Sequence, residues 1–263
     1  MGGTKASPAV DRALNILEVI SEGNSGLTNA YLARRLGIPK SSASSILRLL
    51  QNRGYLCRYA ENGRYKLGFK ILTLGRKLLE NSDFRDLALP FMQDLVDRVD
   101  LTCHLAMLGQ YEAVHLEKIV ARRYFKQDKT RSVGERVPLH SSSVGKALLA
   151  WQELPVLEAS LPSMELHKFS PRTITTRARL LAKLHEVRKQ GYALDDEECR
   201  LGWRCVGAPI FDLLGSSRVA ICLTGTVSEL DDSKLTPVAV AVKETAQRIS
   251  NRLASEHIQF ATY

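Results

Sequence analysis

Residues 39 to 53 combine serine and arginine side chains at a spacing that suits recognition of a polyanion. Pro39 favours the first turn of a helix, and Gly54 ends it. One side of this helix carries Ala43, Ile46, Leu47 and Leu50, and the opposite side carries Ser41, Ser44, Ser45 and Arg48. Serine hydroxyls reach phosphates or base edges, and an arginine can donate two hydrogen bonds to guanine. We therefore predict that this polar face, with Lys40 and Ser42 beside it, contacts a DNA groove.

A basic hairpin and a local excess of positive charge support this prediction. Asn62-Gly63 predicts a tight turn between strands at 55–58 and 64–67. The hairpin carries Arg58, Arg64 and Lys66, in the position of the wing of a winged helix. Residues 1–80 contain 13 Lys and Arg against 5 Asp and Glu, whereas residues 81–263 contain 24 against 23. A solvated serine face is the alternative, but charge confined to one segment favours a polyanion, and we expect double-stranded DNA.

A second group of residues could bind a small anion. Ser141-Ser142-Ser143-Val144-Gly145-Lys146 opens a predicted helix over 142–151. Free backbone N–H groups at a helix N-terminus attract negative charge. The segment is not a P-loop, because His140 stands where the first glycine would be and Ala147 follows the lysine. From the residues alone, ordinary serine caps are an equally good interpretation.

Four carboxylates, Asp195-Asp196-Glu197-Glu198, precede the segment between Cys199 and Cys205. Such a run is most often a solvated loop, although it could accept hydrogen bonds from a ligand. Cys205 as a nucleophile would need a nearby base. The candidates are His104, His140 and His167. The spacing fixes none of them, so a buried, unreactive cysteine is the better interpretation. Five residues between the two cysteines do not match a zinc site, and we expect no metal, no cofactor and no catalytic residue.

Short helices must position the predicted DNA-contact residues. Periodic apolar residues predict helices from Pro8 to about Gly23, from Thr28 to Gly37, and from Pro39 to about Arg53. Ala33 is small where two helices must cross, and Gly37 permits the positive φ of a tight turn. A connecting helix is predicted from Leu67 to about Glu80, before a second domain that starts at Asp83.

The second domain mixes strands and helices without strict alternation. Helices are predicted over 84–99, 142–151, 176–190 and 233–256. Strands are predicted over 102–108, 113–119, 205–211 and 218–225. This order favours an α+β fold in which helices pack on a largely antiparallel sheet.

Composition limits the class of protein. The chain has 263 residues, of which 44% are hydrophobic and 25% charged, as in globular proteins. It lacks an apolar run of the roughly 18 to 20 residues that a membrane span needs, and its first residues do not form a signal peptide. Five cysteines without a C-x-x-C pair argue against a secreted disulfide scaffold. We expect a cytoplasmic protein without a membrane partner.

In sequence order, nearly the whole chain resembles the IclR family of bacterial transcriptional regulators. The matching stretches are 10–14, 16–17, 32–42, 54–56, 65–68, 136–151, 191–198 and 202–212. The resemblance implies a winged helix-turn-helix domain (1–68), a linker helix (69–82) and a GAF-like effector-binding and oligomerisation domain (83–263). It also implies homodimers or dimers of dimers.

The resemblance further implies a ligand site in the second domain. In ligand-bound relatives the first and third carboxylates of the acid run face the ligand, which carries over to Asp195 and Glu197. A cysteine after the run and two small polar residues on a later strand carry over to Cys205, Cys222 and Thr224. The helix start supplies Ser142, Ser143, Val144 and Gly145. Relatives commonly have serine at the strand positions, so Cys222 departs from the pattern and changes the polarity of the expected site.

These observations predict a ligand-responsive regulator, repressors being the commoner form in this family. It would bind operator DNA and a small carboxylate, such as a hydroxy acid or sugar acid, as its effector. Two alternatives remain open. A cysteine-dependent hydrolase with a DNA-binding appendage would turn candidate metabolites over, and a ligand-independent nucleic-acid binder would lack a pocket.

Overall fold

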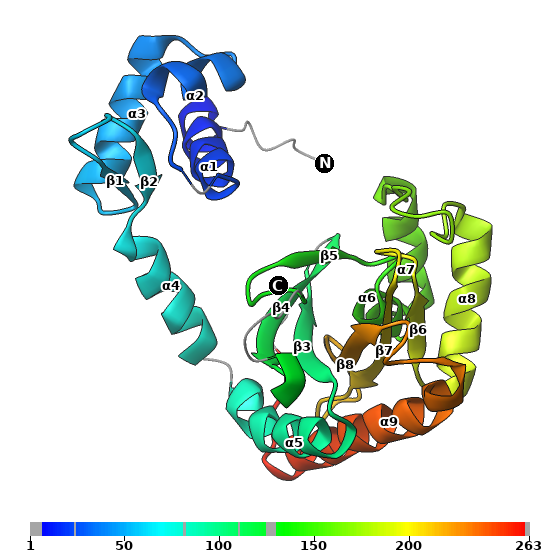
Figure 1. Cartoon of the computed structure of the whole chain (residues 1–263). Helices are drawn as coiled ribbons and strands as arrows, with labels where there is room; N and C mark the ends of the chain where they lie inside the picture. Colours follow the sequence, from blue (N-terminus) through cyan, green and yellow to red (C-terminus); the bar gives the residue numbers. More distant parts are fainter. Residues whose placement is uncertain (1–6, 24, 81–82, 110, 125–129, 261–263) are drawn as a thin grey trace. The chain divides into compact units, whose positions relative to one another are not determined.

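The computed structural model describes residues 7–23, 25–80, 83–109, 111–124 and 130–260. The chain divides into two compact units, 1–81 and 82–263, and each has its own hydrophobic core (Figure 1). No helix among these described residues is long and apolar enough to cross a membrane.

The first unit packs three helices against a two-stranded hairpin. Its described elements are α1 (Pro8–Ser21), α2 (Asn29–Arg35), α3 (Lys40–Asn52), β1 (Leu56–Arg58), β2 (Tyr65–Leu67) and α4 (Phe69–Glu80). Buried Ile16, Ile20, Leu32, Leu47, Leu56 and Tyr65 form its core. One residue from each strand and at least one from each of the first three helices reaches this core, so the hairpin is fixed to the helices by apolar packing.

Local sequence explains the turn between α2 and α3. The Thr28 hydroxyl accepts a hydrogen bond from the Tyr31 N–H (3.3 Å), which caps α2. Gly37 has a φ of +63°, a conformation that costs glycine little, and the next N–H, of Ile38, bonds back to the Ala33 carbonyl (3.0 Å). The predicted helix boundaries and turn are confirmed here to within two or three residues.

The second unit is built on one antiparallel sheet. The strands are β3 (Thr102–Leu108), β4 (Glu112–Ile119), β5 (Arg136–Pro138), β6 (Ala193–Asp196), β7 (Trp203–Ile210) and β8 (Val219–Thr226). In the described part of the chain they follow the order β5-β4-β3-β8-β7-β6. The helices are α5 (Asp83–Val99), α6 (Ser143–Ala150), α7 (Leu154–Ser160), α8 (Arg177–Gln190) and α9 (Asp232–Ser255). Short 3-10 turns occupy Arg122–Tyr124 and Leu161–Ser163.

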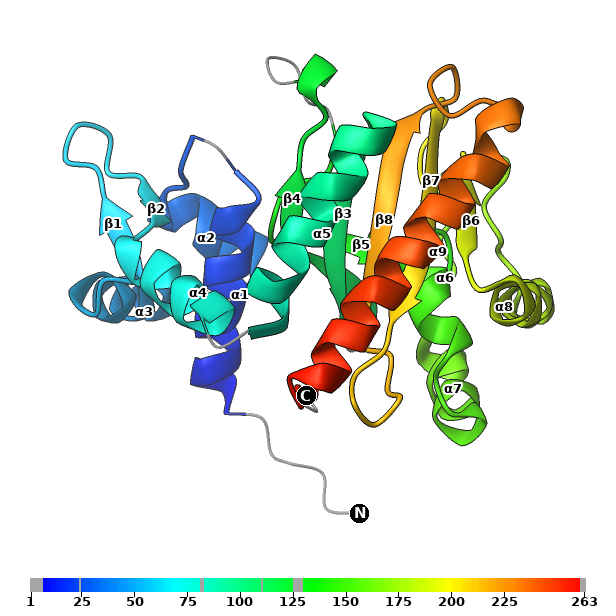
Figure 2. The same ribbon diagram turned by 90° about the horizontal axis from the view of Figure 1, so that it is seen from below.

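Helices cover both faces of this sheet. Helices α5 and α9 lie side by side on one face, and α6, backed by α8, packs on the other (Figures 1 and 2). The α6 face is lined by small side chains, including Ala106, Ala193 and Ala220, so a fully buried helix fits closely. The predicted α+β fold with an antiparallel sheet is confirmed.

Three elements have no clear signal in the sequence. β5 has three residues, and α7 has seven and begins at Leu154-Pro155, so both are too short for periodicity to indicate them. β6 contains the first two carboxylates of the acid run, which the residue types favour as a loop. Pairing with β7 places Ala193 and Asp195 in the interior, so tertiary packing overrides local composition.

Candidate functional site

The N-terminus of α6 lies against β7. Ser142 caps the helix: its hydroxyl accepts a hydrogen bond from the Gly145 N–H (3.0 Å) and donates one to the Pro138 carbonyl (2.7 Å). A Cβ at position 145 would clash with the backbone of Leu139, so glycine is required there for close approach. Ser143 packs directly on Gly207 of β7. The start of the helix is therefore held by backbone contacts on two sides.

A cavity of about 330 Å³ opens beside this helix start. Its lining residues come from β3, β4, β7, β8, the start of α6 and the segments 130–137 and 195–203. They are His104, His115, Thr130, Arg131, Glu135, Val137, Ser142, Ser143, Val144, Asp195, Cys199, Arg200, Trp203, Cys205, Cys222 and Thr224. The cavity combines a helix N-terminus and some apolar groups with many polar and charged side chains, a composition that suits a small polar ligand.

Most of the predicted ligand residues line this cavity. They are Ser142, Ser143, Val144, Asp195, Cys205, Cys222 and Thr224. Gly145 and Glu197 are not among the lining residues. The Glu197 carboxylate instead accepts a hydrogen bond from the Gly202 N–H (2.8 Å) and faces Arg172 (3.4 Å). Glu197 has a φ of +61°, so the chain turns there and its side chain closes the loop.

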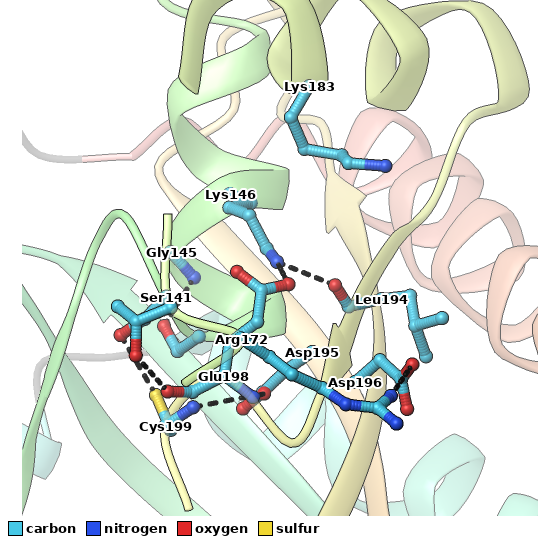
Figure 3. Close-up of polar contacts among 12 residues, drawn as sticks. Ser141, Gly145, Lys146, Arg172, Lys183, Leu194, Asp195, Asp196, Glu198 and Cys199 are labelled. Atoms are coloured by element: carbon cyan, nitrogen blue, oxygen red, sulfur yellow. Dashed lines mark hydrogen bonds and ion pairs between the residues drawn. The ribbon is translucent and has the colours of Figure 1, made fainter. Parts of the chain in front are cut away.

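Asp195 is the buried carboxylate of the cavity wall. Its Oδ1 accepts hydrogen bonds from the N–H groups of Glu198 (2.8 Å) and Cys199 (3.2 Å), as Figure 3 shows for Cys199. Burial raises the pKa of Asp195 above its usual value. The same two N–H contacts fix the direction of the chain after β6 and hold Asp195 in one orientation.

A buried contact between Lys146 and Glu198 lies next to Asp195. Lys146, from the first turns of α6, is fully buried and contacts Glu198, and it also donates a hydrogen bond to the Leu194 carbonyl (2.6 Å) (Figure 3). Burial raises the pKa of Glu198 to about 7, although Lys146 opposes this. These contacts connect α6 to the acid run, so they hold the two parts of the predicted site together.

The cysteines of the cavity are neutral thiols. Burial raises the pKa of Cys205 and Cys199 well above the usual range, and raises the pKa of Cys222 to about 12. The Thr224 hydroxyl donates to the Cys205 sulfur (3.3 Å). Because the thiolate is the nucleophile, these surroundings do not activate Cys205.

Two of the candidate bases for Cys205, His140 and His167, do not line the cavity. His140 bonds through Nε2 to the His167 carbonyl (3.0 Å), so it is engaged elsewhere, and the exposed His167 lies beside Glu165. Among the described residues, no group of three or more His, Cys, Asp or Glu side chains is arranged to hold a metal ion.

The first unit presents the predicted DNA-contact residues on α3. Lys40, Ser41, Ser44, Ser45 and Arg48 are exposed, Ser42 is half-buried, and Ala43 and Leu47 are fully buried. The helix is therefore amphipathic in the predicted sense, with its serine and arginine face in solvent.

The hairpin residues have structural contacts as well as charge. Arg58 packs over the Tyr65 ring (5.7 Å), and Lys66 over the Tyr59 ring (5.1 Å). The Arg64 guanidinium donates a hydrogen bond to the Gly26 carbonyl (3.0 Å), which ties the hairpin to the loop before α2. Arg64 therefore supports the hairpin, and its substitution affects more than a surface charge.

Comparison with known proteins identifies both units. A model of the IclR helix-turn-helix domain matches residues 9–58, and a model of the C-terminal part of the bacterial transcriptional regulator IclR matches residues 76–251. The chain belongs to the IclR family. The predicted resemblance is confirmed, and this IclR-family chain is a transcriptional regulator with a helix-turn-helix domain and a C-terminal effector-binding domain.

Relatives in the IclR family match over nearly the full length. The chain is 32% identical over 245 residues to the transcriptional regulator XynR of Escherichia coli, covering 93% of this chain and 96% of XynR. It is 28% identical over 244 residues to the transcriptional repressor IclR of the same organism, covering 92% and 88%. The structure of Thermotoga maritima IclR matches with a TM-score of 0.73 at 28% identity, covering 93% and 98%. An IclR homologue of Microbacterium hydrocarbonoxydans, solved with 4-hydroxybenzoate, matches with a TM-score of 0.78 at 25% identity, covering 94% and 99%.

The IclR-family cavity contains residues that sequence reasoning missed. His115, Thr130, Arg131, Glu135, Val137, Arg200 and Trp203 line it but have no motif that indicates a site. The sequence indicates His104 only as a candidate base for Cys205. The one available signal is a histidine on each of two adjacent predicted strands, where apolar residues are the rule.

Proposed function

We propose that this IclR-family regulator is a repressor that binds operator DNA as a homodimer and binds a small hydroxy acid in the cavity of its second unit. The carboxylate of the effector lies at the N-terminus of α6, and Asp195 accepts a hydrogen bond from an effector hydroxyl. Effector binding changes the affinity for DNA.

The cavity supports the effector part of this proposal. Ser143 and Val144 line it at the start of α6, where backbone N–H groups and the helix dipole favour an anion. The Thr224 hydroxyl, which donates to the Cys205 sulfur, can accept a hydrogen bond from a ligand. Neutral thiols at Cys205 and Cys222 favour binding without turnover. The complex of the Microbacterium relative with 4-hydroxybenzoate, itself a hydroxy acid, adds support.

The exposed face of α3 supports the DNA part. Its residues, Lys40, Ser41, Ser44, Ser45 and Arg48, are small or basic and can approach a groove closely. Ser42, which is half-buried, and the hairpin residues Arg58, Arg64 and Lys66 supply further contacts to phosphates, with the Arg64 guanidinium also holding Gly26. The net charge of residues 1–80 adds a sequence-independent attraction to DNA.

Two observations support a homodimer. One α3 offers only a few outward side chains, too few to distinguish an operator within a genome, whereas two copies double the readout. Helix α4 leaves large apolar groups in solvent, with Phe69 88% and Leu72 68% exposed. An apolar face of this kind on a connecting helix suits contact with a second copy.

The effector proposal is tested with the full-length protein and a panel of small acids. Trp203 lines the cavity, so its fluorescence reports binding directly. We expect glycolate, longer hydroxy acids or 4-hydroxybenzoate to bind, and mass spectrometry to recover the acid unchanged. Recovery of a chemically altered acid would contradict the proposal and favour the hydrolase.

Two variants of the acid run form a matched pair. Asp195→Asn keeps the Oδ1 acceptor that holds the loop but removes the negative charge from the cavity. Glu197→Gln removes a charge of the same run outside the cavity lining. We expect the first variant to bind hydroxy acids about tenfold more weakly and the second to bind as the parent does. Equal binding by the parent and both variants would remove Asp195 from the site.

A further inference from the structure

A buried histidine on β4 lines the cavity. His115 on β4 is 3% exposed and lines the cavity. Its Nδ1 has no hydrogen-bond partner among the residues that the structure describes. A buried polar atom without a partner is costly, and in a cavity wall it is available to a ligand.

A β-bulge turns His115 toward the cavity. β4 pairs Glu117 with Leu105 but His115 with Ala106, so Leu116 has no partner in the ladder. The extra residue reverses the alternation of side chains, and His115 therefore shares a sheet face with Lys118 and with His104 of β3. The His115 and His104 rings are 4.7 Å apart between centroids and inclined by 53°.

The surroundings keep His115 uncharged. Burial lowers its pKa to about 4, and the nearby cations Arg131 and Lys118 act in the same direction. At neutral pH one ring nitrogen donates and the other accepts. A neutral imidazole of this kind can bind a hydroxyl group, because the hydroxyl can either donate a hydrogen bond to a ring nitrogen or accept one from it.

We propose that His115 binds the distal hydroxyl of the effector, so that the cavity selects straight-chain hydroxy acids long enough to reach from α6 to β4. This inference rests on the proposed function, because it assumes that the effector carboxylate lies at the start of α6. It assigns His115 as a residue that determines specificity for effector length.

The order of the strands sets the distance that the effector must span. Ser143 of α6 lies on β7, and β4 is three strands away in the order β7-β8-β3-β4. Neighbouring strands are about 4.8 Å apart, and His115 is paired two residues further along β3 than His104, so the backbones at the two ends are about 14 to 16 Å apart along the sheet. Three bonds of an extended chain span about 3.8 Å, so a six-carbon acid covers about 7 to 8 Å from its carboxyl carbon to its last oxygen. A hydrogen bond of about 2.8 Å and the imidazole itself fill the rest, whereas a two-carbon acid cannot reach.

The test compares a short and a long acid on the full-length protein. The probes are glycolate, gluconate and 6-deoxygluconate, with affinities measured by Trp203 fluorescence and calorimetry. We expect gluconate to bind the parent about tenfold to a hundredfold more tightly than 6-deoxygluconate does. His115→Phe should remove this difference and leave glycolate affinity unchanged. His115→Asn, which retains a hydrogen-bonding atom near the position of Nδ1, should recover part of it, and His185→Phe on the exposed surface of α8 is the matched control.

Each outcome decides between the two proposals. Equal binding of gluconate and 6-deoxygluconate overturns the role of His115 and leaves the proposed function intact. The same conclusion follows if the parent binds glycolate but does not bind gluconate. A loss of affinity for glycolate and gluconate alike in folded His115→Phe and His115→Asn shows a structural role and also overturns the inference. Failure of every carboxylate to bind the parent overturns the proposed effector class itself.

Discussion

Replacing Glu198 by glutamine should change how the stability of the second unit depends on pH. Glu198 is 7% exposed and contacts the fully buried Lys146, and burial raises its pKa to about 7 from an ordinary value of 4.5. As pH rises from 4.5 to 7, this carboxyl ionises in the unfolded chain while it stays protonated in the folded one. The free energy of unfolding therefore falls over this range, and the loss is complete above pH 7.

The magnitude follows from the pKa difference. Each unit corresponds to about 1.4 kcal/mol, so between pH 5 and pH 8 the parent loses on the order of 2 to 3 kcal/mol through this group. Glutamine resembles the protonated carboxyl and does not titrate. We expect the stability of Glu198→Gln relative to the parent to increase by roughly 2 to 3 kcal/mol from pH 5 to pH 8.

Urea unfolding followed by tryptophan fluorescence measures this difference. Trp151 and Trp203 are the two tryptophans of the chain, and both belong to the second unit, so the signal reports that unit alone. Glu244→Gln, an exposed carboxylate on α9, is the control and should give a constant difference. If the difference between the parent and Glu198→Gln instead stays constant between pH 5 and pH 8, then Glu198 is ionised throughout and the reasoning is refuted.

Three further variants test other parts of the structure. Gly145→Ala drives a methyl group into the backbone of Leu139, so urea unfolding of the second unit should show a loss of about 1–3 kcal/mol. Gly75→Ala, in α4 of the first unit and with nothing within 4 Å of its new Cβ, should leave this transition unchanged, and an equally unchanged transition in Gly145→Ala would contradict the packing of α6. Arg48→Ala should lower the affinity for a selected DNA duplex by about 1–3 kcal/mol in anisotropy titrations and relax preference at one base pair; a uniform loss over all sequences would show a phosphate contact instead. Leu47→Ala empties a fully buried position and should cost the first unit about 2–5 kcal/mol by circular dichroism, without moving the tryptophan transition.

The fold was predictable from the sequence where local signals agree with packing. Thr28 caps α2, Gly37 has the expected positive φ, and Asn62-Gly63 lies in the turn between β1 and β2. Strand β3 runs from Thr102 to Leu108, as predicted. In each case one short stretch of chain contains the information, so no knowledge of distant residues is needed.

The cavity was only partly predictable. The start of α6 and Asp195 have recognisable patterns, whereas His115 depends on the bulge at Leu116, which strict alternation does not indicate. The resemblance places Glu197 in the ligand site, but its side chain contacts Gly202 and Arg172 because the chain reverses direction there. Bulges and turns of this kind are decided by pairing with remote strands.

We expect a small acid in the cavity to change the affinity of the winged helix for DNA. The most direct test measures binding of the full-length protein to a duplex selected from a random library, with and without a saturating hydroxy acid from the binding panel. We expect a change of about 5-fold to 150-fold for the parent, and for Asp195→Asn the same change only at an acid concentration about tenfold higher. A parent that binds the acid tightly but shows the same DNA affinity in its presence and absence would contradict the account.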